Sequence, residues 1–176
     1  MSNTSTINAH ARNPPASGNF RLCSNFCSFN VRSLLQVGCN TLLGLSLKHF
    51  VAVVAAVSEL HLKDSGIRKI SIPDKFDHLK SVDVYDLFHS GSQNGLYGVG
   101  IAILSSIRSS VIDFNVIDDR LCYMSIQAKP HNLYFISAYA PANTYSDDIK
   151  DDFYDSILHC VNSAPPGDVV ILCGGF

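Results

Sequence analysis

The sequence VAVVAAVSEL, residues 51–60, decides the fold of this chain. Its first seven residues are all apolar, so they predict a strand that is covered on both faces inside a sheet. Polar residues return at Ser58 and Glu59, so a carboxylate follows the end of the buried strand. Upstream, Phe26–Val31 predicts another strand, and leucines between residues 34 and 47 predict a helix. The expected order is therefore strand, helix, strand.

Downstream of residue 83 the sequence turns into short extended segments. A hairpin is predicted where Pro130 and Asn132 separate the last two, because Pro130 lacks an amide donor and Asn132 tolerates turn geometry. Neighbouring segments are therefore expected to pair antiparallel. The segments are Val84–Phe88, Gly98–Leu104, Val111–Ile117, Leu121–Ala128 and Leu133–Ala140.

A second helix is predicted after Ser146, which is a candidate N-cap. Its apolar residues recur at every fourth position as Ile149, Phe153, Ile157 and Val161. One more buried strand follows at residues 168–173. Strands that alternate with helices and a central meander indicate a mixed α/β fold.

With 176 residues, the chain has room for one domain. Residues 1–20, which contain Asn-Pro-Pro at positions 13–15, are expected to be a flexible leader, and the domain is expected to occupy residues 21–176. No signal peptide is recognisable, and the longest apolar run, Phe50–Val57, is too short for a transmembrane segment. An intracellular and possibly nuclear location without a membrane partner is expected.

The formal net charge of −2 conceals an uneven distribution. Residues 1–82 carry nine basic and four acidic side chains, whereas residues 83–176 carry four basic and eleven acidic ones. A uniform basic coat for nucleic acid is excluded, although the first half could face phosphates. Charge alone does not identify the partner.

Six short motifs follow one another in an order that resembles the endonuclease/exonuclease/phosphatase superfamily, including the endonuclease domains of non-LTR retrotransposons. Within it the chain resembles the retroelement-derived group called craniofacial development protein 2-like. The resemblance implies a four-layered α/β sandwich of the DNase I-like type, here incomplete at its C-terminus. The motifs are Ser28–Arg32, Ser58–Leu60, Tyr97–Ala102, Asp119–Leu121, Ser137–Pro141 and Val170–Gly174.

The resemblance also implies a magnesium-dependent phosphodiesterase with DNA as its substrate. Glu59 matches the metal-ligating glutamate, Asn30 matches an asparagine that orients the active site, and Tyr139 matches a tyrosine that hydrogen-bonds the phosphate. Arg120 aligns with a substrate-binding arginine near the cleft. The same side chains have structural alternatives: a solvated carboxylate, a turn cap, a packed aromatic ring and a strand-end salt bridge.

The chain departs from the family pattern at its last residues. Where the family has Gly-Asp-x-Asn, Gly174 is followed by Gly175 and Phe176, and the later Asp-His pair is absent. Without these proton-handling groups we expect a catalytically impaired fragment whose magnesium binding is weak or lost. Two alternatives stay open: a non-enzymatic remnant that binds nucleic acid or protein, and a small-molecule phosphoesterase of the same superfamily. The sequence does not specify the oligomeric state.

Overall fold

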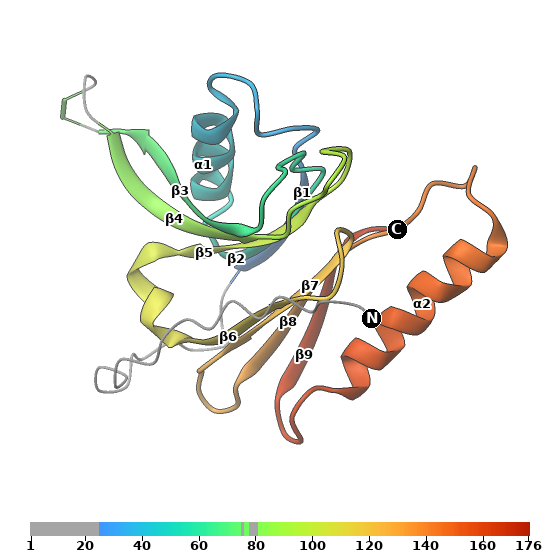
Figure 1. Cartoon of the computed structure of the whole chain (residues 1–176). Coiled ribbons are helices and arrows are strands. Elements are labelled where there is room, and N and C mark those ends of the chain that lie inside the picture. The colour runs from blue at the N-terminus through green and yellow to red at the C-terminus, as the bar shows by residue number, and fades with distance from the viewer. Residues whose placement is uncertain (1–24, 75, 78–80) are drawn as a thin grey trace.

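The computed structural model describes residues 25–74, 76–77 and 81–176 (Figure 1). The predicted leader, residues 1–20, lies outside the described residues. Two sheets, two α-helices and one short 3-10 helix make up the described part. In chain order they are β1 (Asn25–Asn30), α1 (Cys39–His49), β2 (Ala52–Ser58), β3 (Gly66–Pro73), β4 (Ser81–His89), β5 (Val99–Leu104), η1 (Ser105–Ser110), β6 (Val111–Val116), β7 (Leu121–Ile126), β8 (Leu133–Tyr139), α2 (Asp147–Asn162) and β9 (Val169–Gly175).

The first sheet has the strand order β1-β2-β5-β4-β3. β1 and β2 are parallel and joined through α1, and the other pairs are antiparallel. The prediction for residues 51–57 is confirmed, because β2 lies between two neighbours and six of its seven residues are buried. The wholly apolar composition of β2 thus reflects burial on both faces of the sheet.

The second sheet has the strand order β6-β7-β8-β9. β6, β7 and β8 form an antiparallel meander as predicted, and the turn around Pro130 joins β7 to β8. The predicted pairing of the segment Gly98–Leu104 with Val111–Ile117 is wrong, because β5 pairs with β2 and β4 in the first sheet. β9 is parallel to β8, and α2 forms the connection between them. Parallel neighbours need such a crossover because their starts lie at the same end of the sheet.

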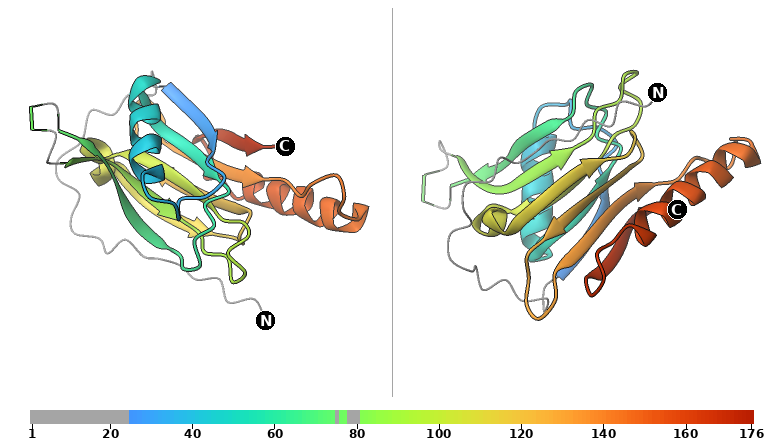
Figure 2. Two further views of the ribbon diagram at one scale, coloured as in Figure 1. Left: turned by 90° about the horizontal axis from the view of Figure 1, so that it is seen from above. Right: turned by 60° about the horizontal axis from the view of Figure 1, so that its bottom comes forward.

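The two sheets face each other and enclose the main core (Figures 1 and 2). Val54, Ile101 and Ile103 of the first sheet pack with Met124 and Phe135 of the second. On the outer side of the first sheet, α1 contributes leucines to a second cluster, and α2 packs on the outer side of the second sheet. The mixed α/β class with two sheets is therefore confirmed.

Two local features differ from the sequence-based expectation. β3 was missed, because the consecutive charged and exposed residues Arg68 and Lys69 precede the buried Ile70 and Ile72 of this strand at the edge of the sheet. α2 does begin after Ser146, but the Ser146 side chain makes no capping hydrogen bond. On this helix Phe153 and Ile157 are buried, while Ile149 is 46% exposed, so the predicted stripe is only partly covered.

The topology brings several loops to one end of the sandwich. β1 and β2 run parallel and pair Asn30 with Ser58 at that end. β8 and β9 pair Tyr139 with Gly175, and β1 lies beside β9 at the edges of the two sheets. Residues that follow these strand ends therefore meet between the sheets. Among the described residues, no helix is long and apolar enough to cross a membrane.

Candidate active site

Three of the predicted site residues meet at one carboxylate oxygen. Asn30 Nδ2 donates a hydrogen bond of 2.6 Å to Glu59 Oε1, and the Tyr139 hydroxyl donates another of 2.6 Å to the same atom. Asn30 and Glu59 come from the first sheet, whereas Tyr139 ends a strand of the second. Glu59 is also the only glutamate of the chain. The sequence motifs thus converge on a single acidic group.

The backbone around Glu59 takes a conformation that is uncommon for residues other than glycine. Glu59 has φ 57°, and His61 and Arg32 nearby have φ 58° and 55°. Such left-handed backbones cost on the order of 1–2 kcal/mol each, and they cluster at functional sites. Backbone hydrogen bonds compensate for this cost: the Leu60 amide donates to the Gly98 carbonyl, and the His61 amide donates to the Tyr97 carbonyl.

Electrostatics keep Glu59 ionised and Tyr139 protonated. The hydrogen bond from Tyr139 is the largest influence on the pKa of Glu59, which lies below its ordinary value despite partial burial. Asn30 and the nearby His61 and Arg32 lower the pKa further. The pKa of Tyr139 is raised, first by its bond to Glu59 and then by burial. At neutral pH the site therefore offers a carboxylate acceptor beside a phenolic donor.

We expect Glu59→Gln to move the pKa of Tyr139 back toward its ordinary value, because the anion that opposes ionisation is removed. Titration of ring-labelled tyrosine by NMR measures this change, and Tyr139→Phe identifies the resonance. The hydrogen-bonded pair stabilises the fold at pH values between the lowered pKa of Glu59 and the raised pKa of Tyr139. This stabilisation is lost as the pH falls through the pKa of Glu59 or rises through the pKa of Tyr139. An unchanged Tyr139 titration in the Glu59→Gln variant would contradict the hydrogen bond.

Arg120 lies next to Tyr139, and its guanidinium contacts aromatic rings and backbone carbonyls of neighbouring residues. Its guanidinium carbon lies 3.8 Å from the Tyr97 ring centroid and 5.5 Å from those of Tyr139 and Tyr145. Its Nη1 donates to the carbonyls of Tyr139 and Ala140, each at 3.3 Å. No ion pair of Arg120 occurs among the described residues, so the structure gives no support to the salt-bridge alternative. Substrate binding by Arg120 stays a prediction.

Two tyrosines of this cluster were not predicted as site residues. The Tyr97 and Tyr145 hydroxyls are hydrogen-bonded to each other, which joins the loop before β5 to the loop before α2. Tyr97 stands inside one of the six motifs, but nothing in the sequence indicates that Tyr145 approaches it from 48 residues away. The contact depends on the packing of the two sheets.

Comparison with solved structures identifies the fold. TDP2 of D. rerio, solved with a single-strand DNA product, aligns with a TM-score of 0.57 and 19% identity over 84% of this chain and 58% of that one. An endonuclease/exonuclease/phosphatase family protein from Leptotrichia buccalis aligns with a TM-score of 0.50 and 17% identity over 84% of this chain and 64% of that one. The chain has the endonuclease/exonuclease/phosphatase fold.

Sequence similarity agrees with this fold. Craniofacial development protein 2 of Bos taurus is 30% identical over 97 residues, which are 54% of this chain and 16% of that protein. The counterpart from Tragulus javanicus is 28% identical over 97 residues. The chain thus spans about a sixth of the length of these relatives. No family model matches it. The predicted resemblance to the superfamily is confirmed.

In this endonuclease/exonuclease/phosphatase fold, Gly175 lies directly beside the candidate site. It pairs with Tyr139, and a Cβ added to it would lie 3.4 Å from the Tyr139 ring, which is ordinary contact. Gly174 differs, since its φ is 157° and an added Cβ would lie only 1.8 Å from the Ala138 carbonyl oxygen. A side chain fits at position 175 and not at position 174.

The oxygen atoms at the site are suited to a hard divalent cation. Glu59 Oε1 accepts both hydrogen bonds, and Oε2 has no hydrogen-bond partner among the described residues. Magnesium is commonly held by one or two carboxylates and keeps several waters, so this single carboxylate fits it. No group of three or more His, Cys, Asp or Glu side chains in the described part could hold a metal. A cation here would rely on water and substrate for its other ligands.

Proposed function

We propose that Glu59, Asn30 and Tyr139 form the metal-binding side of a magnesium-dependent phosphodiesterase site that acts on DNA. The observation that carries this proposal is the convergence of an amide and a phenol, from two different sheets, on one ionised carboxylate oxygen. Enzymes of this fold are typically magnesium-dependent. A retroelement origin, which the order of sequence motifs implies, is part of this proposal.

Each of the three residues has a distinct role in this proposal. Glu59 binds the cation through its carboxylate, and Asn30 fixes the orientation of that carboxylate through its amide. Tyr139 keeps its proton at neutral pH, and on substrate binding its single O–H would turn from Glu59 Oε1 to donate to a phosphate oxygen. Bound magnesium neutralises the charge that develops on the phosphoryl oxygens.

DNA as the substrate is supported by a structural relative and by the arginine next to the site. TDP2 of D. rerio has been solved with a single-strand DNA product. Arg120 is fixed by Tyr97 on its face and by two carbonyls at Nη1. Such a preorganised guanidinium is suited to donate to a phosphate.

Position 175 limits catalysis in this proposal. A side chain there would lie beside Tyr139, and the family pattern has an aspartate at this position. Glycine cannot orient or deprotonate the attacking water, and general-base groups typically contribute about 10² to 10⁴-fold to the rate. We therefore propose that the chain binds the cation and substrate weakly and hydrolyses DNA slowly.

Metal binding tests the proposal separately from turnover. We expect manganese, which has similar ligand preferences to magnesium, to bind near one equivalent in electron paramagnetic resonance titrations, and Glu59→Gln to weaken this binding about tenfold or more. Asp113→Asn, which removes a carboxylate from β6, serves as the matched control. Equal manganese binding by the Glu59→Gln variant and the wild type would refute the proposed site. Robust, chelator-sensitive plasmid nicking by the wild type would refute only the slow turnover.

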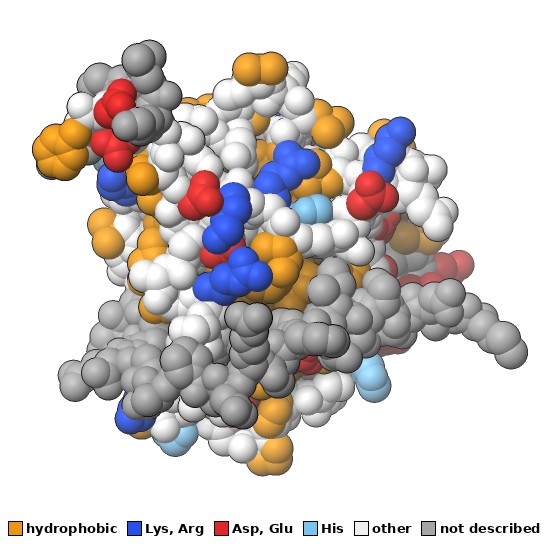
Figure 3. Space-filling model, turned by 60° about the vertical axis from the view of Figure 1, so that its left-hand side comes forward, with side chains coloured by type: hydrophobic (Ala, Val, Ile, Leu, Met, Phe, Trp, Pro, Cys, Tyr) orange, Lys and Arg blue, Asp and Glu red, His pale blue; other side chains and the backbone are white. Residues whose placement is uncertain are grey.

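A non-enzymatic role in nucleic-acid binding is the competing function. It would require a basic surface from the first half of the chain, yet on the face shown in Figure 3 acidic side chains stand among the basic ones. Binding of a protein to the phosphate backbone of nucleic acid depends steeply on the salt concentration and does not require a metal ligand. Salt-dependent DNA binding that Glu59→Gln leaves unchanged, together with no manganese site, would favour this function.

A further inference from the structure

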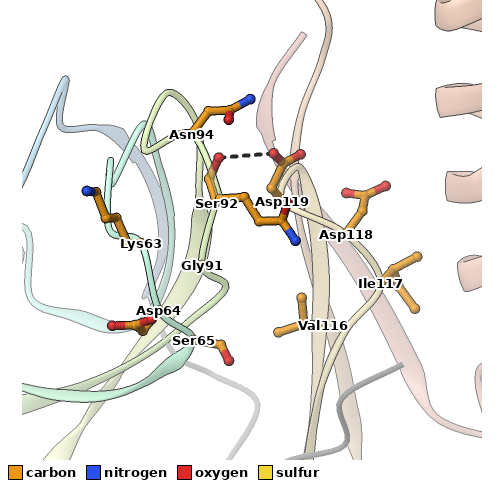
Figure 4. A pocket seen from close by; sticks show the side chains of 11 residues that line it. Lys63, Asp64, Ser65, Gly91, Ser92, Asn94, Val116, Ile117, Asp118 and Asp119 are labelled. Atoms are coloured by element: carbon orange, nitrogen blue, oxygen red, sulfur yellow. Dashed lines mark hydrogen bonds between the residues drawn. The ribbon is translucent and has the colours of Figure 1, made fainter. Parts of the chain in front are cut away.

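A polar pocket of about 580 Å³ opens between the two sheets at the same end as Glu59 (Figure 4). Its volume lies in the range of small-molecule sites, about 300–1,000 Å³. Three loops form it: the loop between β2 and β3, the loop between β4 and β5, and the turn between β6 and β7. The candidate active site does not use any of these lining side chains.

The walls of the pocket are held by specific contacts. Ser92 Oγ donates to Asp119 Oδ2 at 3.1 Å and ties the two sheets together across the opening, with Ser65 and Val116 on opposite sides below it (Figure 4). Only glycine fits at position 91, because a Cβ there would lie 2.3 Å from the Lys63 carbonyl oxygen. These contacts fix the positions of two of the loops that form the walls of the pocket.

A short chain of contacts joins the pocket to the candidate active site. Asp119, in the pocket wall, precedes Arg120, whose guanidinium stacks on Tyr97 and donates to the Tyr139 carbonyl. The Tyr139 hydroxyl in turn bonds to Glu59. A substrate with its phosphate at Glu59 can therefore extend past Arg120 toward the pocket.

The charges of the pocket decide which part of a nucleotide it can accept. Asp64, Asp118 and Asp119 outnumber Lys63 in the lining, so a second phosphate is repelled. Asp119 Oδ1 has no hydrogen-bond partner among the described residues, while Oδ2 already accepts from Ser92. A carboxylate oxygen in this position accepts hydrogen bonds from amino and ring N–H groups, as aspartate does from the amino group of cytosine.

We propose that this pocket binds an unpaired nucleobase that carries an amino group, and that Asp119 is the group that reads it. The inference rests on the proposed function, because it takes the adjoining phosphate to lie at Glu59. Only single-stranded nucleic acid fits, since a base inside a duplex is paired and stacked. Adenine, cytosine and guanine present the amino group, whereas thymine offers only one ring N–H, which is flanked on both sides by carbonyl oxygens that the carboxylate repels.

The experiment compares short fluorescein-labelled oligothymidines with the same oligomers that carry one central cytosine, adenine or guanine. Fluorescence anisotropy in the presence of manganese, measured before the slow turnover consumes the oligomers, gives the dissociation constants. We expect roughly tenfold tighter binding of at least one amino-bearing oligomer than of oligothymidine. Asp119→Leu should reduce this preference to within about twofold, because it removes the acceptor and keeps the size of the side chain.

Three controls separate base reading from other effects. Asp118→Leu makes the same charge change in the same turn and should keep the preference. Ser92→Ala removes the internal hydrogen-bond donor to Asp119 and should keep or increase the preference for amino-bearing oligomers. The double variant Ser92→Ala with Asp119→Leu should lose this preference, and it leaves no buried serine hydroxyl without a partner. Equal binding of all oligomers, no binding at all, or a preference that survives Asp119→Leu would each overturn the inference. Failure of the wild-type protein to bind manganese would instead count against the proposed function.

Discussion

Gly175→Asp should raise magnesium-dependent hydrolysis of DNA by about 10² to 10⁴-fold, the contribution typical of a general base. The new carboxylate would project beside Tyr139, where an added Cβ meets only ordinary contact distances. It would then lie next to Tyr139, whose hydroxyl donates to the proposed cation ligand Glu59, and could orient and deprotonate water. Nicking of supercoiled plasmid, measured as an initial rate with magnesium and with chelator, gives the result.

Matched variants decide whether the gain comes from a base. Gly175→Asn has the same size but cannot accept the proton, so it should give at most a small gain. Adding Glu59→Gln to the Gly175→Asp variant should abolish the gain, since both groups act as one unit. Gly174→Asp should unfold the protein instead, because position 174 has no room for a side chain. A folded Gly175→Asp variant with the wild-type rate would contradict the proposed role of this position.

The second large effect is expected at Asp86, a carboxylate in β4 that is fully buried. Its Oδ1 lies 2.7 Å from Lys69 Nζ and 2.7 Å from Arg108 Nη1. Burial raises the pKa of Asp86, but the bond from Lys69 and the charge of Arg108 outweigh it and hold the pKa below its ordinary value. Replacing both cations by methionine should cost about 3–5 kcal/mol, because an unpaired charge stays buried.

Urea denaturation at neutral pH measures this loss. Adding Asp86→Asn to the double variant should recover much of it, since the buried charge is then gone. Because the pKa of Asp86 is lowered in the folded protein, its pairing stabilises the wild type above the unfolded-state pKa and is lost as the pH falls through the folded-state value. The double variant should lose this acid sensitivity. Equal stability of wild type and double variant would show that the ion pairs contribute nothing.

Local sequence patterns predicted most of the elements of this fold. The wholly apolar run at residues 51–57 gave the interior strand β2, and the turn at Pro130 gave the β7–β8 hairpin. Such features depend on neighbours along the chain, so they can be read from periodicity and turn chemistry. β3 was missed for the opposite reason, because its charged residues, such as Arg68, are compatible with an edge strand only once β4 lies beside it.

The candidate site was predictable only in part. Asn30, Glu59 and Tyr139 were named from the order of motifs, and the structure brings all three together. The cluster around Arg120 was not predictable, since Tyr97 and Tyr145 approach it from loops that the two sheets bring together. The pocket at Asp119 was missed for the same reason.

The sequence by itself determined most of the segments that become strands and helices, with the exception of β3, and which polar residues stand at strand ends, because these properties depend on short-range periodicity and steric preference. Only the tertiary structure decided that Asn30 and Tyr139 share one oxygen of Glu59, that Gly175 stands beside them, and that Ser92 reaches Asp119. Those distances depend on strand register and on the packing of one sheet against the other. Both arise from burial summed over the whole core and are not encoded in any single segment.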